Sequence, residues 1–364
     1  MQLALISFWH VHADDYVCEA LEHPGVTLRT AWDADADRGG AKAAQYGLKF
    51  QPDLDALLAD PAVAGVIVTS STAEHLDLIP RAARAGKHVF TEKVVAPTLA
   101  DTDAILAAVA EAGVVMSVAL NRAVEPATVK ALELIAADEL GEIRAVSVRL
   151  AHDGALASPE HPTGWLPERF YDPAEAAGGA IIDLGAHPLY VARLLTGMPA
   201  RLRATATSNT GRAVEDGATI TLHAANGATG TAEVSIASAD RGYAFGVTGS
   251  AGSIAYTQGG DFLLERNGAT ETIALATEWP RPFARFVEAV RQATQPAQTP
   301  PGQGEPPAQP PLPEAPAVSA DNIALARDLT ALVEAAYRSI ATGEAVDLAT
   351  LGYLPTVTET TRNS

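Results

Sequence analysis

The 364-residue chain contains one cysteine, Cys18, and no long apolar run. A lone cysteine excludes a disulfide within the chain and a zinc site built from several thiolates. No apolar run approaches the roughly 20 residues that are needed to span a bilayer. Residues 1–5 have no basic flank and read as a first strand rather than a signal peptide. We therefore expect a cytoplasmic protein without a membrane span.

Positive charge is scarce as well, with 25 Lys and Arg against 44 Asp and Glu and a formal net charge of −19. This balance argues against nucleic acid and against an anionic membrane surface as partners. It does not argue against a dinucleotide, because Rossmann folds hold diphosphate with backbone N–H groups and a helix N-terminus. Only five of the basic residues are lysines. Each lysine is therefore a candidate for a role that needs a compact, titratable ammonium.

The first 120 residues alternate short apolar strands with helices. The expected strands are residues 3–7, 26–32, 64–69, 87–91 and 114–120, and the expected helices are residues 14–22, 36–46, 74–85 and 101–112. Strands that alternate with helices of this length are typical of a doubly wound parallel sheet. We expect an N-terminal Rossmann domain over residues 1–121.

The pattern changes after Asn121 to alternating strands with hairpin-like turns such as Asn226-Gly227. It predicts a C-terminal α+β domain, residues 122–350, with a large, mostly antiparallel, open-faced sheet. An open apolar face is most simply covered by a second subunit, so we expect a homodimer or homotetramer through this sheet. Residues 295–316 are dense in Pro, Gln, Gly and Ala and are expected to form a flexible insertion.

Glycine is missing from the first strand-to-helix turn, which reads Ser7-Phe8-Trp9-His10-Val11-His12-Ala13. The usual G-x-G-x-x-G spacing lets the backbone approach a diphosphate without a Cβ in the way. Either the phosphates lie differently here, or the protein binds no dinucleotide. Asp33 ends the second strand, where an acidic side chain accepts from the adenosine ribose and favours NAD over NADP. Its alternative role is to cap the next helix.

Two segments carry candidate catalytic residues. Lys93 follows a strand and is expected at the carboxyl edge of the sheet, where its ammonium can neutralise a developing alkoxide. Asp183 and His187 are four residues apart, so in a helix they share a face, and a carboxylate beside an imidazole suits a general base. A solvated surface lysine and an ordinary buried Asp–His hydrogen bond are the alternatives. The nine histidines show no specific zinc spacing, so no metal is expected.

The chain resembles the Gfo/Idh/MocA oxidoreductases, relatives of glucose–fructose oxidoreductase and inositol dehydrogenase. The resemblance is carried by residues 86–93, 140–143 and 178–187, and residues 121–122, 214–216, 248–252 and 337–339 also fit. It implies hydride transfer between a nicotinamide cofactor, NAD before NADP, and a secondary alcohol of a sugar, polyol or sugar-derived substrate. Two departures are Val94, in place of the proline that follows the family lysine, and the glycine-free first turn.

The resemblance also implies roles for individual residues. Lys93 is expected to be catalytic, His187 to exchange a proton with the substrate oxygen, and Asp183 to lie at the substrate hydroxyls. The residues expected to contact the cofactor are Ser7, Phe8, Trp9, His10, His12, Asp33, Thr69, Ser70, His75, Glu92, Lys93 and Asn121. Those expected to contact a polyhydroxy substrate are His152, Asp153, Trp165 and Arg169.

The function that this pattern predicts is an NAD-dependent oxidoreductase. One alternative is a non-catalytic protein of the same fold that binds a dinucleotide or another ligand. A further alternative is a lyase or hydrolase that uses tightly bound NAD transiently.

Overall fold

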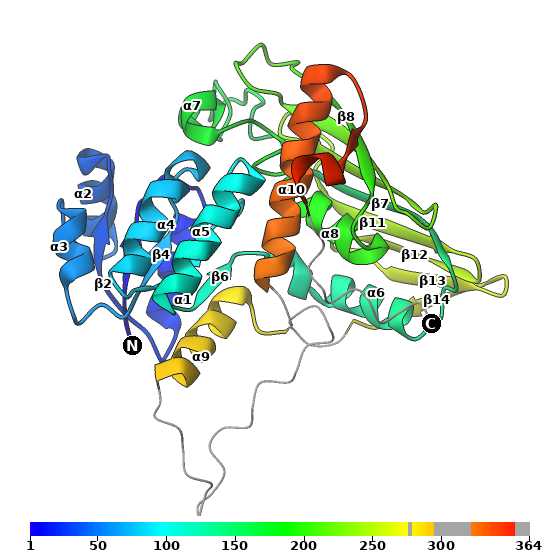
Figure 1. The fold of residues 1–364 in the computed structure, drawn as a ribbon. Coiled ribbons are helices and arrows are strands. Elements are labelled where there is room, and N and C mark those ends of the chain that lie inside the picture. The colour runs from blue at the N-terminus through cyan, green and yellow to red at the C-terminus, as the bar shows by residue number, and fades with distance from the viewer. Residues whose placement is uncertain (276–278, 295–321, 354–364) are drawn as a thin grey trace, which may run out of the picture.

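The computed structural model describes residues 1–275, 279–294 and 322–353. The predicted insertion at residues 295–316 lies outside the described residues. Two sheets organise the described chain, one at each side of the view in Figure 1. No helix in the described part is long and apolar enough to cross a membrane.

The first sheet is parallel throughout, with the strand order β3-β2-β1-β4-β5-β6. Its strands are β1 (Gln2–Ile6), β2 (Thr27–Trp32), β3 (Lys49–Phe50), β4 (Gly65–Val68), β5 (His88–Thr91) and β6 (Met116–Val118). Its helices are α1 (Ala13–Glu22), α2 (Ala36–Gln45), α3 (Leu54–Ala59), α4 (His75–Arg84) and α5 (Leu99–Ala112), with the short η1 (Thr72–Glu74) before α4. The predicted Rossmann architecture is confirmed. Only β3 and α3 escaped the sequence pattern, because two and six residues are too short to show a period.

Local sequence explains the ends of these elements. Strand β1 is apolar on both faces because helices cover both sides of a parallel sheet. The side chain of Asp35 accepts from the N–H groups of Asp37 and Arg38 and caps α2. Helix α5 begins after a Thr98 cap and ends at Gly113, which takes the left-handed conformation that favours glycine.

The second sheet has the strand order β14-β13-β12-β11-β7-β10-β9-β8-β15, and all its pairings are antiparallel except β10 with β7. Its strands are β7 (Ile143–Ala151), β8 (Arg201–Thr207), β9 (Gly217–His223), β10 (Thr229–Ser235), β11 (Gly242–Gly249), β12 (Gly252–Thr257), β13 (Phe262–Arg266), β14 (Ala269–Ile273) and β15 (Val346–Asp347). The mostly antiparallel sheet of the predicted second domain is confirmed.

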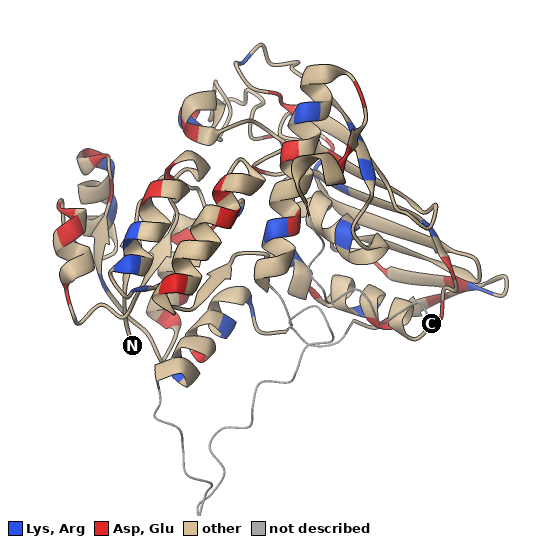
Figure 2. Ribbon diagram, viewed as in Figure 1, with Lys and Arg blue, Asp and Glu red and all other residues tan. Residues whose placement is uncertain are grey.

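Helices cover one face of this second sheet (Figure 1). The helical elements of this part are η2 (Asn121–Val124), α6 (Pro126–Ala136), η3 (Glu168–Tyr171), α7 (Pro173–Ala176), α8 (Ala186–Thr196), α9 (Pro282–Thr294), α10 (Asn322–Thr342) and η5 (Leu348–Leu351). Strand β8 alternates buried and exposed residues, as expected for a sheet with one covered face. The ribbon in Figure 2 marks acidic positions, with some basic ones, along the helices of the first domain, and positions of both signs on the second sheet.

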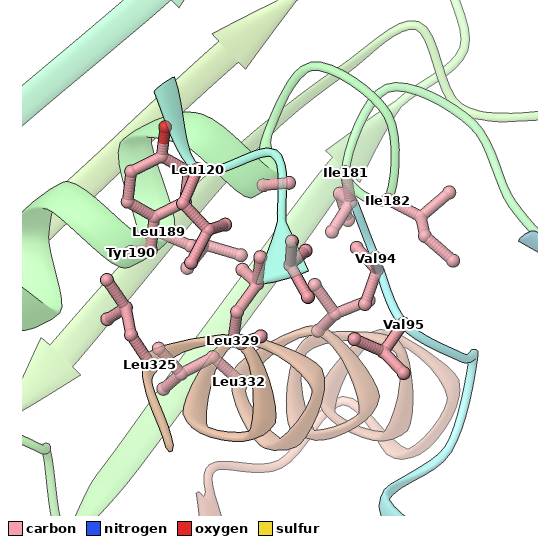
Figure 3. Packing of buried hydrophobic residues seen from close by; sticks show 14 of the residues in the cluster. Val94, Val95, Leu120, Ile181, Ile182, Leu189, Tyr190, Leu325, Leu329 and Leu332 are labelled. Atoms are coloured by element: carbon pink, nitrogen blue, oxygen red, sulfur yellow. The ribbon is translucent and has the colours of Figure 1, made fainter. Parts of the chain in front are cut away.

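Two apolar contacts join the parts of the chain. Helix α9 packs against the first sheet, where Phe283 meets Phe90 with ring centroids 5.3 Å apart. Figure 3 shows Val94 and Val95, which follow β5, packed between α10 and the residues before α8. This second contact holds the carboxyl edge of the first sheet against the second part of the chain. The division of the chain at residue 121 stays a prediction.

Candidate active site

The site is organised by an ion pair between the two segments that the sequence singled out. Lys93 lies just beyond β5, and its ammonium donates to the backbone oxygen of Asp183 at 2.8 Å and to Oδ1 at 2.9 Å. The Lys93 side chain is 1% exposed and that of Asp183 is 21% exposed. Burial alone would raise the pKa of Asp183, but Lys93 and His10 hold it well below its usual range. The Lys93–Val94 peptide bond is cis.

Glu92 forms a second buried centre next to this pair. Its Oε1 accepts from the Tyr16 hydroxyl at 2.8 Å and lies 3.0 Å from Nδ1 of His12, and its Oε2 accepts from the backbone N–H of Lys93. Asn121 donates to the Tyr16 hydroxyl at 3.2 Å. Burial opposes ionisation of Glu92, but the His10, His12 and Lys93 charges hold its pKa well below the usual range. The sequence did not reveal Tyr16, because its place among the apolar positions of α1 reads as ordinary core.

His187 is buried, but it does not contact Asp183 as predicted. Helix α8 begins at Ala186 after Gly185, so Asp183 lies in the preceding turns, where its N–H donates to the carbonyl of Gly179. The predicted helical Asp183–His187 pair is therefore wrong, since the i,i+4 spacing places two side chains on one face only within a continuous helix. Nδ1 of His187 lies 3.1 Å from the hydroxyl of Tyr190 instead.

The electrostatic environment keeps His187 neutral. Burial, followed by the charges of Lys93 and Arg122, lowers its pKa well below the usual value. Because the charge of Lys93 acts on the pKa of His187 and both side chains are buried, the two groups belong to one electrostatic environment. His187 comes from the second part of the chain and Lys93 from the first, so this environment spans the two.

The carboxylate of Asp33 is fully used within the protein. It accepts from the N–H groups of Phe8 at 2.6 Å and Asp35 at 2.9 Å, and from the guanidinium of Arg38 at 2.6 and 3.0 Å. Together with the Ser7 hydroxyl, 3.4 Å from Oδ2, these donors fill the roughly four lone-pair sites of a carboxylate. The predicted contact of Asp33 with a ribose would therefore need one of these donors to move. The Asp33–Arg38 pair instead holds the first turn against the start of α2.

The β1–α1 turn is closed by residues from far along the chain. We call residues 168–176, which include η3 and α7, the η3–α7 segment. The Trp9 ring stacks on Phe170 with centroids 4.5 Å apart, and its Nε1 donates to Glu175 at 2.7 Å. Arg169 donates to the carbonyl of Trp9 at 2.6 Å. Arg169, predicted to contact the substrate, thus lies at the turn.

Within the described residues, every backbone N–H of the turn at residues 7–13 except that of Val11 donates to the protein. Ser7 takes the positive φ of 73° that a glycine usually supplies. Five N–H groups that a diphosphate would use already donate to oxygen or nitrogen atoms of the protein. They are the backbone N–H groups of Ser7, Phe8, Trp9, His10 and His12. At the β1–α1 turn, the carboxyl edge of the first sheet therefore binds an anion only after these protein contacts rearrange.

The inner end of the same edge contains two buried imidazole nitrogens that make no hydrogen bond among the described residues. Nε2 of His10 faces Oδ1 of Asp183 at 3.5 Å, and Nε2 of His75 has no neighbour of this kind. His75 points Nδ1 at the carbonyls of Val94 and Val95, 3.1 Å away, so Nδ1 carries the proton and Nε2 is an acceptor. His10 accepts the N–H of His12 at Nδ1, so its Nε2 is a donor. Burial lowers the pKa of His75 to about 4, and it is neutral at pH 7.

A nicotinamide carboxamide fits this pair of nitrogens chemically, because it offers one oxygen acceptor and one NH₂ donor. The residues at the inner end thus fit the ring of a nicotinamide cofactor, whereas the η3–α7 segment covers the diphosphate end. A cation is a poorer fit. Ligand atoms of His10, His12 and Glu92 lie within 4.8 Å of one another. However, Nδ1 of each imidazole already has a hydrogen-bond partner, and the ammonium of Lys93 is close by.

The remaining predicted residues lie around this edge. Thr69 donates its hydroxyl to the carbonyl of Ser7 at 2.6 Å, and Ser70 is buried beside it. His152 packs against Trp165, which is 42% exposed and donates to Asp153. Burial lowers the pKa of His152, and the Asp183 charge opposes this effect, which places His152 near the ion pair. The sequence missed Arg241, which pairs with Asp153 at 3.2 Å, because nothing local links residues 88 positions apart.

Two family models match the chain. One, described as an oxidoreductase family with an NAD-binding Rossmann fold, matches residues 10–120, and the other, the GFO/IDH/MocA C-terminal domain, matches residues 128–255. The chain belongs to the Gfo/Idh/MocA family. The predicted family is thereby confirmed.

Individual relatives are more distant. The 1,5-anhydro-D-fructose reductase of Ensifer adhaerens is 33% identical over 183 residues, which are 48% of this chain and 50% of that protein. The matches to this and two other curated relatives span about half of the length of each. The crystal structure of GenD2 from gentamicin A biosynthesis in complex with NAD has a TM-score of 0.73 at 25% identity, over 95% of this chain and 96% of that chain.

The fold is also shared with KijD10, a 3-ketoreductase from Actinomadura kijaniata in complex with NADP and TDP-benzene. The TM-score is 0.75 at 19% identity, over 93% of this chain and 98% of that chain. Family members thus bind a nicotinamide cofactor, and both NAD and NADP occur among proteins of this fold.

Proposed function

We propose that this protein is an oxidoreductase that transfers a hydride between a nicotinamide cofactor and a carbon–oxygen centre of a sugar, polyol or sugar-derived substrate. The observation that carries the proposal is the buried Lys93–Asp183 ion pair at the carboxyl edge of a Rossmann sheet, with the neutral His187 beside it. Ligands of open α/β sheets bind at this edge. The names of curated relatives, which include sugar and inositol dehydrogenases, support this substrate class.

The residues of the site divide the work of such a reaction. A bound nicotinamide supplies or accepts the hydride. Lys93 has three N–H bonds, and two of them go to Asp183, which leaves one for a substrate oxygen. The ammonium stabilises the negative charge that develops on that oxygen. His152, Asp153 and the exposed Trp165 form a partly buried polar and aromatic rim on which a polyhydroxy substrate can lie.

We favour NAD over NADP as the cofactor. Arg38 pairs with Asp33 and Asp35 at the start of α2, and Asp37 lies in the first turn of this helix. Even with Arg169 close to this group, a 2′-phosphate at this point would meet an excess of negative charge. Fluorescence titration with NADH and with NADPH measures the preference directly. We expect at least tenfold tighter binding of NADH, and equal or tighter binding of NADPH would contradict this choice.

A homodimer or homotetramer through the second sheet also remains our proposal. The uncovered face bears a shallow groove lined in part by Arg149, Thr205, Thr219 and Glu233, which leaves polar and charged groups for contacts with a second copy. Light scattering of the purified protein determines the mass in solution, and a monomer at micromolar concentration would contradict the proposal.

Binding and turnover together test the redox function. We expect saturable NADH binding, and turnover with at least one of 1,5-anhydro-D-fructose with NADH, or scyllo-inositol, D-xylose or levoglucosan with NAD. The closed β1–α1 turn favours one alternative, a ligand-binding protein of the same fold without catalysis. No cofactor released on denaturation and no saturable NADH binding would support that alternative and overturn the proposal.

A further inference from the structure

We propose that Tyr190 is a positioning residue that fixes His187 in the tautomer with its proton on Nε2. His187 then acts as a hydrogen-bond donor to a carbonyl oxygen, and it is not the base that removes the proton of an alcohol. The inference rests on the proposed redox function for the nature of the reacting oxygen. The tautomer itself follows from the hydrogen bonds of the protein alone.

The hydroxyl of Tyr190 has one proton to give. Its oxygen accepts from the backbone N–H of Arg122 at 2.9 Å, and it lies 3.1 Å from Nδ1 of His187. Tyr190 is 0% exposed, and among the described residues its hydroxyl makes these two hydrogen bonds. Figure 3 shows the hydroxyl oxygen directed away from the leucines of α10. Because a buried hydroxyl proton needs an acceptor, it goes to Nδ1 of His187.

The charged groups around His187 keep only one proton on its ring. Burial and the charges of Lys93, Arg122 and His12 lower its pKa, and only Glu92 acts in the opposite direction. A neutral imidazole that accepts at Nδ1 must carry its proton on Nε2. The burial of Tyr190 raises the pKa of its phenol well above the usual value, so the hydroxyl remains a donor.

His10 repeats this arrangement. Its Nδ1 accepts the backbone N–H of His12 at 3.1 Å, so Nε2 carries the proton and faces Oδ1 of Asp183 at 3.5 Å. Lys93, His10 and His187 therefore all present N–H donors at this edge. Such a group of donors matches a carbonyl oxygen, which only accepts, better than a hydroxyl, which also needs an acceptor for its own proton.

The arrangement favours reduction of a ketone or aldehyde. The carbonyl carbon takes a hydride, with reduced nicotinamide as the two-electron donor, and the π electron pair of the C=O bond moves to the oxygen. That oxygen takes a proton from the Lys93 ammonium, and the Nε2–H of His187 donates a hydrogen bond to the developing alkoxide. In the opposite direction the alcohol proton would pass back to an uncharged Lys93 amine, because the Nε2–H of His187 cannot accept it.

Nuclear magnetic resonance of the full chain with ¹⁵N-labelled histidine tests the tautomer without substrate or cofactor. Two-bond ¹H–¹⁵N correlations distinguish a protonated ring nitrogen from an unprotonated one, and loss of one set of signals in His187→Gln assigns the residue. We expect an unprotonated Nδ1 and a protonated Nε2 at pH 7.5. A protonated Nδ1 overturns the proposal, and it does so whether or not the protein proves to be an oxidoreductase.

The role of Tyr190 is tested with Tyr190→Phe, which removes only the hydroxyl. We expect the Nε2–H tautomer to lose its dominance, so that the two ring nitrogens shift toward averaged values. Tyr46→Phe is the matched control, because Tyr46 caps the end of α2 and makes none of the hydrogen bonds of His187 or Tyr190. It should leave the His187 signals unchanged. If Tyr190→Phe folds and keeps the pure Nε2–H tautomer, Tyr190 does not position His187. If it does not fold, the tautomer of the unmodified protein still decides whether His187 is a donor.

Discussion

The two ends of one sheet edge differ in how they satisfy their polar groups. At the inner end, around Lys93 and His187, charged side chains are buried, and two imidazole nitrogens make no hydrogen bond within the described part of the chain. At the β1–α1 turn, most of the N–H groups donate within the protein, and Trp9 is stacked on Phe170. An unsatisfied buried polar atom costs about 1–3 kcal/mol, which a ligand recovers when it binds. The inner end is therefore built for a ligand, whereas at the turn a ligand must first displace protein contacts.

The largest effect should come from removing the charge at the inner end. Lys93→Met leaves the carboxylate of Asp183 without its ion partner, so we expect the unfolding free energy to fall by about 3–5 kcal/mol. Turnover should fall by about 10²–10⁴-fold, because the proton donor to the substrate oxygen is lost. Urea unfolding and steady-state rates measure the two effects.

Lys130→Met is the control for this experiment, because Lys130 pairs with Glu133 on the surface of α6 and should change stability by less than about 1 kcal/mol. Unchanged turnover in a folded Lys93→Met protein would limit Lys93 to a structural role.

The buried imidazole of His75 should make the inner end sensitive to acid. Its pKa is about 4 in the folded protein against a usual value of 6.5. The unfolded chain therefore binds the proton first, and stability is complete above pH 6.5 and is lost as the pH falls toward 4. The loss from this group should be about 3 kcal/mol.

Urea unfolding of His75→Asn between pH 4.5 and 7.5 measures this contribution, because Asn keeps a donor for the carbonyls of Val94 and Val95. The variant should lose less stability than the unmodified protein as the pH falls. His161→Asn, in an exposed loop, is the control. Equal pH dependence in the His75 variant and the unmodified protein would mean that His75 does not titrate in this way.

The smallest effect should come from loosening the closed turn. Glu175→Gln weakens the charge-assisted hydrogen bond from Trp9 by about 1 kcal/mol. If closure competes with a diphosphate, ADP should bind roughly fivefold more tightly to the variant by calorimetry. Glu168→Gln, exposed on the same segment, should leave the affinity unchanged. Weaker ADP binding to Glu175→Gln would show instead that the η3–α7 segment contributes to the bound state.

Much of the fold followed from local pattern. The alternation of apolar strands and helices predicted the parallel sheet, and the hairpin turns predicted the antiparallel one, because both patterns record which faces of a short segment are buried. The position of Lys93 was predictable for the same reason, since a residue just after a buried parallel strand lies at its carboxyl edge. Local pattern did not predict the partners of these residues. The Asp183–His187 pair was wrong because the spacing said nothing about where α8 begins.

The sequence by itself determined the two architectures, the acidic surface and the presence of a lysine and a histidine suited to redox chemistry. Only the tertiary structure decided what each side chain touches. Tyr16 reaches Glu92 across 76 residues, and Glu175 closes the turn at Trp9 across 166 residues. The physical reason is range: periodicity reports the burial of a segment, whereas hydrogen bonds and charge act over a few ångströms between segments that folding alone brings together.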